Sequence, residues 1–119
     1  LADIEIVEIH HNRKKDIPSG TAITLGESIK EGNQKSKRFV FREKNNDRVR
    51  IKNEIGFSSI RGGNVVGEHT VYFFMDGETI KLTHIASDRK VFSEGALRAA
   101  VWITKQKIGF YSTTDMLKI

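Results

Sequence analysis

Residues 71–75, Val-Tyr-Phe-Phe-Met, place five apolar side chains in succession, and Asp76-Gly77 follows them directly. Asp-Gly between two runs of β-branched and aromatic residues strongly predicts a two-residue hairpin turn, whose second arm here is residues 78–87. A strand covered on one face alternates apolar and polar residues, whereas a strand covered on both faces does not. We therefore expect a sheet with helices on one face and a second subunit on the other.

Three further segments have the composition of strands. Residues 3–9, DIEIVEI, are rich in β-branched residues and alternate between polar and apolar over most of their length. Residues 39–41 and 55–60 are shorter runs of the same kind. These segments precede the hairpin and predict the remaining strands of its sheet.

A first helix is predicted directly after Pro18. Ser19 is a favoured N-cap residue, and Gly32 is a plausible C-terminal stop. Spacings of three, four and seven residues put one set of small and apolar residues on a single helical face: Ala22, Leu25, Gly26 and Ile29.

A second helix is predicted in the C-terminal part. Ser93 is expected to cap it, and it should run from Glu94 to about Lys107. Residues 110–119 form either a short helix or an extended arm. Strands and helices are interspersed, so the predicted class is α+β, with a mixed, mostly open sheet of about four strands.

The composition excludes several classes of protein. The sequence contains no cysteine, which rules out disulfides, cysteine-ligated zinc and thiol catalysis, and it fits a reducing compartment. No apolar run approaches the roughly 20 residues that a membrane-spanning helix needs. The formal charge of +5 suits an anionic partner, either a nucleic acid or a small polyanion.

The stretch from Glu8 to Ala22, EIHHNRKKDIPSGTA, concentrates polar groups between a strand and a helix. The first N–H groups of a helix have no partner within the helix, and the positive end of the helix dipole lies there, so this end attracts anions. Gly20 lets an anion approach the backbone closely. The predicted anion-binding groups are His10, His11, Lys14, Ser19, Gly20 and Thr21.

Simpler interpretations exist for each part of this pattern. Residues 19–21 taken alone are a common N-cap, and paired surface histidines are usually incidental. The histidines and Asp16 could bind a metal ion, but the flanking cations oppose a divalent ion, so we expect none. Arg61 could support the loop or face solvent. Glu68 and His69 could form a charge–imidazole pair or simply start a strand.

Four motifs in this sequence resemble those of bacterial dihydrodipicolinate reductase, also called 4-hydroxy-tetrahydrodipicolinate reductase. They are EIHHNRKKDIPSGTA at 8–22, GFSSIRGGNVVGEHTV at 56–71, THIASDRKVF at 83–92 and GALRAAVW at 95–102. The resemblance covers nearly the whole chain and leaves residues 30–54 as its variable part. Ile17 departs from the family pattern, in which alanine is common.

The resemblance implies a cytoplasmic oxidoreductase of the diaminopimelate route to lysine. NADPH or NADH would deliver hydride to a cyclic unsaturated imine dicarboxylate, giving tetrahydrodipicolinate. By the same resemblance, His10 is the acid/base and Lys14 the proton donor. The implied substrate-binding residues are His11, Ser19, Gly20 and Thr21, and the residues implied at the nucleotide or substrate cleft are Arg89 and Phe92.

Family members resembling this chain begin with a Rossmann domain that carries a glycine-rich nucleotide fingerprint, and no such pattern occurs here. We therefore expect residues 1–119 to be a single substrate-binding and tetramerisation domain with its C-terminal segment. Such a fragment of the enzyme should lack turnover by itself. The resemblance also implies a homotetramer assembled through the sheets, which fits the doubly apolar residues 71–75.

The main alternative is a basic RNA-binding or ribosome-associated module. Its support is the net charge, the basic residues between 37 and 52, and several aromatic residues in the predicted strands. A nucleic-acid surface interleaves exposed aromatics with cations on one face, whereas here the cations fall in predicted loops. A structural oligomerisation domain without a ligand is a further alternative.

Overall fold

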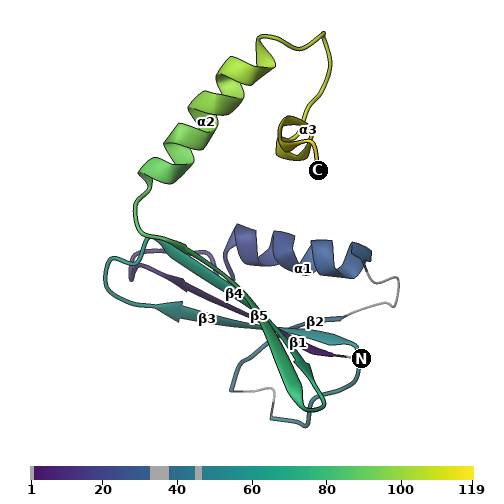
Figure 1. The fold of residues 1–119 in the computed structure, drawn as a ribbon. Helices are drawn as coiled ribbons and strands as arrows, with labels where there is room; N and C mark the ends of the chain where they lie inside the picture. The colour runs from purple at the N-terminus through teal and green to yellow at the C-terminus, as the bar shows by residue number, and fades with distance from the viewer. Residues whose placement is uncertain (1, 33–37, 45–46) are drawn as a thin grey trace. The chain divides into compact units, whose positions relative to one another are not determined.

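The structure is a computed structural model that describes residues 2–32, 38–44 and 47–119. The chain divides into two compact units, the first ending at Ser87 and the second running from Asp88 to Ile119. Figure 1 shows the course of the chain through the first unit and into the second. Among the described residues, no helix has the length and apolar character needed to cross a membrane.

The first unit is built on a five-stranded sheet. Its strands are β1 (Asp3–His10), β2 (Arg38–Phe41), β3 (Glu54–Arg61), β4 (Gly67–Met75) and β5 (Glu78–Ala86). The order across the sheet is β2-β3-β1-β4-β5, with β1 parallel to β3 and antiparallel to β4. The α+β class and the mixed, open sheet are confirmed, although the sheet has five strands where about four were expected.

The hairpin between β4 and β5 forms at the predicted Asp-Gly turn. Gly77 has a φ of +80°, in the left-handed region that a non-glycine residue rarely adopts. Met75 faces Glu78 at the start of the ladder, and the pairing continues to Gly67 opposite Ala86. The turn thereby fixes the register of both strands.

Helix α1 (Gly20–Gly32) covers one face of the sheet, as Figure 1 shows. The core beneath it contains Ile4 and Ile6 of β1, together with other buried residues: Ala22, Ile55, Phe57 and Val71. The predicted apolar face of the helix is confirmed, since Ala22 and Gly26 are buried. A Cβ on Gly26 would lie 2.7 Å from the Phe57 ring, so the helix can approach the sheet only without a side chain at that position.

The opposite sheet face carries exposed apolar groups on β4 and β5. The rings of Tyr72 and Phe74 stack at 5.4 Å between centroids, with an interplanar angle of 9°. Phe74 is 42% exposed, and Ile85 of β5 is 60% exposed. Exposed apolar groups such as the stacked rings of Tyr72 and Phe74 often mark an interface. The subunit contact expected here stays a prediction.

The second unit contains α2 (Lys90–Ile103) and α3 (Thr113–Leu117). The prediction that Ser93 caps the helix is wrong, because the helix begins earlier and Ser93 lies within its first turn. The Asp88 carboxylate accepts the backbone N–H of Lys90 at 2.8 Å, which allows the chain to turn into a helix at that point. The helix also ends at Ile103, short of the expected Lys107.

The sequence predicted either a short helix or an extended arm for residues 110–119, and the structure has the short helix. Ser112 and Asp115 make a capping box, in which each side chain accepts a hydrogen bond from the other residue's backbone N–H. Trp102 of α2 packs edge-on against Tyr111, with 5.4 Å between ring centroids. Helices α2 and α3 of the second unit therefore contact each other through the residues around their connection.

Candidate anion-binding site

The polar stretch singled out in the sequence connects β1 to α1. Two backbone hydrogen bonds join its first residues to the turn after β3. The Asn12 N–H donates to the Gly63 carbonyl at 3.2 Å, and the Gly62 N–H donates to the His10 carbonyl at 3.0 Å. Gly63 has a φ of +52°, which suits glycine in this tight turn. The loop of residues 11–19 is therefore anchored to the sheet at the shared ends of β1 and β3.

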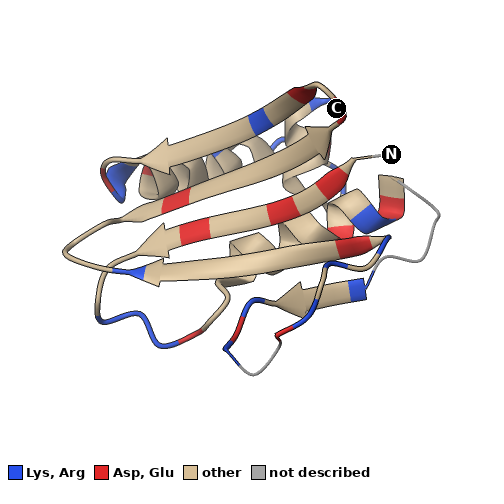
Figure 2. Cartoon of the chain, turned by 90° about the horizontal axis from the view of Figure 1, so that it is seen from below, with Lys and Arg blue, Asp and Glu red and all other residues tan. Residues whose placement is uncertain are grey.

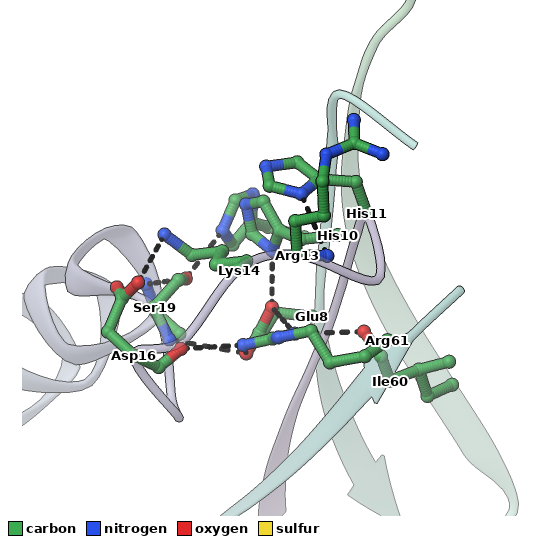
Figure 3. A network of polar contacts seen from close by, with 11 residues as sticks. Glu8, His10, His11, Arg13, Lys14, Asp16, Ser19, Ile60 and Arg61 are labelled. Atoms are coloured by element: carbon green, nitrogen blue, oxygen red, sulfur yellow. Dashed lines mark hydrogen bonds and ion pairs between the residues drawn. The ribbon is translucent and has the colours of Figure 1, made fainter. Parts of the chain in front are cut away.

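A buried carboxylate, Glu8, lies at the centre of this region, as Figure 3 shows. Its side chain is 1% exposed and shares the α1-facing side of β1 with His10. The Arg61 guanidinium binds both carboxylate oxygens, with Nη1–Oε2 at 2.9 Å and Nη2–Oε1 at 2.7 Å. The Ser19 N–H also donates to Oε1, at 3.2 Å.

Glu8 stays ionised despite its burial. Burial is the largest single influence and would raise the pKa of the Glu8 carboxyl. Hydrogen bonds from Arg61, Ser59 and His10, together with the charge of Arg61, outweigh burial and lower this pKa to about 2. A fixed negative charge therefore lies beneath the basic loop.

His10 is held by this carboxylate. Its Nδ1 lies 2.5 Å from Oε2 of Glu8. An ionised carboxylate only accepts hydrogen bonds, so Nδ1 of His10 must carry a proton. The other ring nitrogen, Nε2, faces Gly67 of β4, where a Cβ would lie 3.2 Å away. The glycine leaves open space beside Nε2, the nitrogen that is able to exchange a proton.

Lys14 is held on the same loop by Asp16. The Lys14 ammonium and the Asp16 carboxylate lie 2.8 Å apart, and this hydrogen bond is the main cause of a lowered pKa for Asp16. Figure 3 shows Lys14 and His10 together above the Glu8–Arg61 pair, whereas His11 lies farther out beside Arg13. The loop thus brings one ammonium group and one imidazole to the same side of the buried carboxylate.

The start of α1 completes the site. Ser19 is buried, and its Oγ accepts the Ala22 N–H at 3.2 Å, which confirms it as the N-cap. Among the hydrogen bonds of the described residues, none uses the N–H groups of Gly20 and Thr21. A Cβ on Gly20 would meet nothing within 4 Å. Two backbone donors at a helix N-terminus are therefore available to an anion.

His69 of β4 supports the N-cap from the sheet. Its Nε2 lies 2.9 Å from Oγ of Ser19, and its ring packs edge-on against His10 at 5.0 Å between centroids. Burial, followed by the charge of His10, lowers the pKa of His69, so its neutral form is favoured. The suggested pairing of His69 with Glu68 is not what the structure has, because the hydrogen-bond partner of His69 is Ser19.

The structure brings most of the predicted site residues together. His10, Lys14 and Ser19 gather around Glu8, while Gly20 and Thr21 begin the helix beside them. His11 follows β1 directly, and its Nδ1 accepts the Arg13 N–H at 3.2 Å. The two residues predicted near a nucleotide, Arg89 and Phe92, belong to the second unit, where they lie at the start of α2.

Sequence reasoning missed Glu8 and left Arg61 undecided. The signal for Glu8 was present, since residues two apart on a strand share a face and Glu8 lies two before His10. Arg61 supports the loop: its Nη2 donates to the Asp16 carbonyl at 2.8 Å. Its position opposite His10 depends on the β1–β3 register, which no local pattern encodes.

The basic segment suggested for nucleic acid is occupied by internal ion pairs. Arg42 and Arg50 both bind the carboxylate of Glu5 on β1, and Arg48 binds Glu54. Figure 2 shows Lys and Arg chiefly in loops and at strand ends, while several acidic residues lie along the strands. Among the described residues, these three arginines are thus already engaged with carboxylates.

The sequence matches a protein-family model described as "Dihydrodipicolinate reductase, C-terminus" over residues 2–117. A 4-hydroxy-tetrahydrodipicolinate reductase of Geotalea uraniireducens is 50% identical over 117 residues, which are 97% of this chain and 44% of the relative. The enzyme of the same name from Pseudomonas fluorescens is 45% identical over 120 residues, covering 99% of this chain and 45% of the relative. The chain thus spans somewhat less than half the length of these relatives.

The fold is also similar to a solved structure, the dipicolinate-bound dihydrodipicolinate reductase from Paenisporosarcina sp. TG-14. The TM-score is 0.62 at 26% sequence identity, and the match covers 80% of this chain and 37% of that one. These similar proteins are reductases by name, so they give the RNA-binding alternative no support.

Proposed function

This chain belongs to the dihydrodipicolinate reductase family as a C-terminal domain, and on that premise we propose that it binds the dicarboxylate substrate of a 4-hydroxy-tetrahydrodipicolinate reductase. The whole enzyme would be a cytoplasmic oxidoreductase of lysine biosynthesis that reduces a cyclic unsaturated imine dicarboxylate to tetrahydrodipicolinate. The solved relative named above is described as dipicolinate-bound, which supports a ligand with two carboxylates.

One observation carries the proposal: the available N–H groups at the start of α1 lie beside the loop that presents His10 and Lys14. Helix-start amides bind a carboxylate without needing a counter-charge from a side chain. We assign one substrate carboxylate to Gly20 and Thr21, with the Ser19 hydroxyl beside them. His11 would contact the same ligand from the loop.

We assign the acid–base roles to His10 and Lys14. When hydride adds to an unsaturated carbon of the ring, a proton must be delivered to the other atom of the double bond. Lys14 carries such a proton on its ammonium group, and Nε2 of His10 is the ring nitrogen not engaged with Glu8. A positioned general acid contributes roughly 10²–10⁴-fold to the rate.

The hydride would come from NADPH or NADH, because a reduced nicotinamide supplies a hydride when it is bound beside the substrate. No dinucleotide fingerprint occurs in the sequence, so we expect the nucleotide to be bound mainly outside this chain. Arg89 and Phe92 are the residues of this chain that we assign, by family resemblance, to the nucleotide side. Both side chains are exposed at the start of α2.

Substitution of Lys14 tests the catalytic assignment in the full-length enzyme. Lys14→Ala should lower kcat by at least about 100-fold if this ammonium group is the general acid. Its partner Asp16 is exposed, and exposed ion pairs contribute little to stability, so the protein should remain folded. Lys15→Ala is the matched control, because it removes the same charge from the next, exposed residue. Equal activities of the two variants would remove Lys14 from the mechanism.

We also propose that the domain forms a homotetramer through the sheet face opposite α1, which carries Tyr72, Phe74 and Ile85. Ile85→Asp should reduce the assembly to smaller species in sedimentation velocity. Leu82→Asp is the matched control, because Leu82 lies on the same strand and is 62% exposed, but it faces the α1 side. A native chain that sediments as a folded monomer at micromolar concentration would contradict this proposal.

A further inference from the structure

Glu8 and Arg61 form a buried ion pair, and stability alone does not explain why it lies in this position. Replacing a buried ion pair with well-packed apolar residues is often neutral or stabilising, so such a pair is weak evidence for a purely structural role. Here the pair lies directly below the groups assigned to acid–base work and contacts three segments of the site.

Arg61 is not available to bind a substrate carboxylate. Its Nη1 donates to Glu8 and to the Ile60 carbonyl at 2.8 Å, and its Nη2 donates to Glu8 and to the Asp16 carbonyl at 2.8 Å. These four bonds use all four N–H donors of the two terminal nitrogens. The fifth donor, Nε, is buried and has no hydrogen-bond partner among the described residues. The two terminal nitrogens of Arg61 therefore act within the protein and not on a ligand.

We propose that Glu8 and Arg61 are positioning residues that set the tautomer of His10 and hold the loop and the α1 N-terminus in register around the substrate. This inference rests on the function proposed above and extends it to two residues that do not touch the substrate. The carboxylate acts through His10 and Ser19, and the guanidinium acts through Glu8 and Asp16.

The Glu8 carboxylate sets the tautomer of His10. Nδ1 of His10 lies 2.5 Å from Oε2 of Glu8, and an ionised carboxylate offers no proton. Neutral His10 must therefore keep its proton on Nδ1, which leaves a lone pair on Nε2 beside Gly67. Glu8, which contacts Nδ1, thereby determines that Nε2 is the ring nitrogen able to accept a proton.

Glu8 and Arg61 also fix distances within the site. Oε1 of Glu8 accepts the Ser19 N–H at 3.2 Å, which joins the α1 start to β1. Arg61 holds the Asp16 carbonyl, and the Asp16 side chain in turn holds the Lys14 ammonium. One ion pair thus connects the acid–base histidine, the proton-donating lysine and the carboxylate-binding amides. A shift of about 1 Å in such groups can cost roughly 100-fold in rate.

The test compares Glu8→Gln with the native sequence. Glutamine keeps the shape of the side chain but can donate a proton through its amide, so His10 is no longer required to protonate Nδ1. In ¹⁵N NMR of the imidazole nitrogens at alkaline pH, native His10 should show a protonated Nδ1 and an unprotonated Nε2. The variant should show a substantial population with the proton on Nε2. Glu27→Gln, an exposed change on α1, is the matched control.

Kinetics of the full-length enzyme supply the second readout. Because a mispositioned general acid or base loses much of its contribution, Glu8→Gln should lower kcat at least about tenfold, with a smaller change in KM. Arg61→Lys should behave similarly, because lysine keeps the charge but cannot bind a carboxylate through two parallel bonds. A native tautomer together with native kcat in Glu8→Gln would overturn the proposal.

Failure of this inference is distinguishable from failure of the proposed function. If the native full-length protein reduces the dicarboxylate and Glu8→Gln is as active as Glu27→Gln, the positioning role is wrong and the function stands. If the native protein has no such activity, the proposed function fails, while the His10 tautomer measurement still reports whether Glu8 controls the ring. Arg61→Lys gives an independent variant if Glu8→Gln does not fold.

Discussion

The ionisation of buried Glu8 predicts a measurable loss of stability in acid. Its pKa is lowered from 4.5 to about 2 in the folded chain. The ionised carboxylate therefore stabilises the fold at pH values above 4.5, and this contribution is lost as the pH falls toward 2. At 1.36 kcal/mol per pKa unit, the contribution near neutrality is about 3 kcal/mol. About 2 kcal/mol of it disappears between pH 6 and pH 3.

Urea unfolding of the native chain and of Glu8→Gln, at half-unit intervals from pH 6 to pH 3, isolates this contribution. The variant is expected to be less stable at pH 6, because it leaves Arg61 buried without its counter-charge. The difference in the free energy of unfolding between the two proteins should shrink by about 2 kcal/mol on going to pH 3. Glu27→Gln, which alters an exposed residue, should show no such convergence. A Glu8→Gln difference that stays constant across this range would refute a strongly lowered pKa for Glu8.

Three other substitutions test separate parts of the site and its support. Gly67→Ala places a Cβ 3.2 Å from Nε2 of His10 and should lower kcat of the full-length enzyme; native kcat in a folded variant would show that Nε2 is not the reacting nitrogen. Gly26→Ala drives a methyl group into the Phe57 ring and should cost about 1–3 kcal/mol of unfolding free energy in urea titrations; native stability would contradict the close approach of α1 to the sheet. Ser19→Ala removes the helix cap and should cost about 1 kcal/mol while weakening dicarboxylate binding in calorimetry; native affinity would exclude the hydroxyl from the ligand site.

Local sequence patterns correctly predicted a turn and a helix start, each of which depends on a few adjacent residues. The hairpin follows from Asp76-Gly77, and the start of α1 follows from Ser19, because turn and cap geometry depend on a few adjacent residues. The same reasoning misplaced the start of α2, where two side chains competed. Ser93 is a good cap residue, but the Asp88 carboxylate accepts the Lys90 N–H, and the helix begins at Lys90, four residues before the predicted Glu94.

The strand order and the internal partners of the site could not be read from local patterns. Arg61 reaches Glu8 only because β3 lies parallel beside β1, in a register that places Arg61 opposite His10. His69 reaches Ser19 because β4 pairs with the other edge of β1. Such contacts join residues about 50 positions apart, so they depend on the packing of the whole sheet and not on any single motif.

We propose above that the β1–α1 loop and the start of α1 form a site for a dicarboxylate. The most direct measurement is a titration of ¹⁵N-labelled chain with pyridine-2,6-dicarboxylate, followed by two-dimensional NMR. The account predicts saturable shifts that are largest at the amides of Gly20 and Thr21 and extend to His10 and His11. Absence of any shift at millimolar ligand, or shifts confined to residues 88–119, would contradict it.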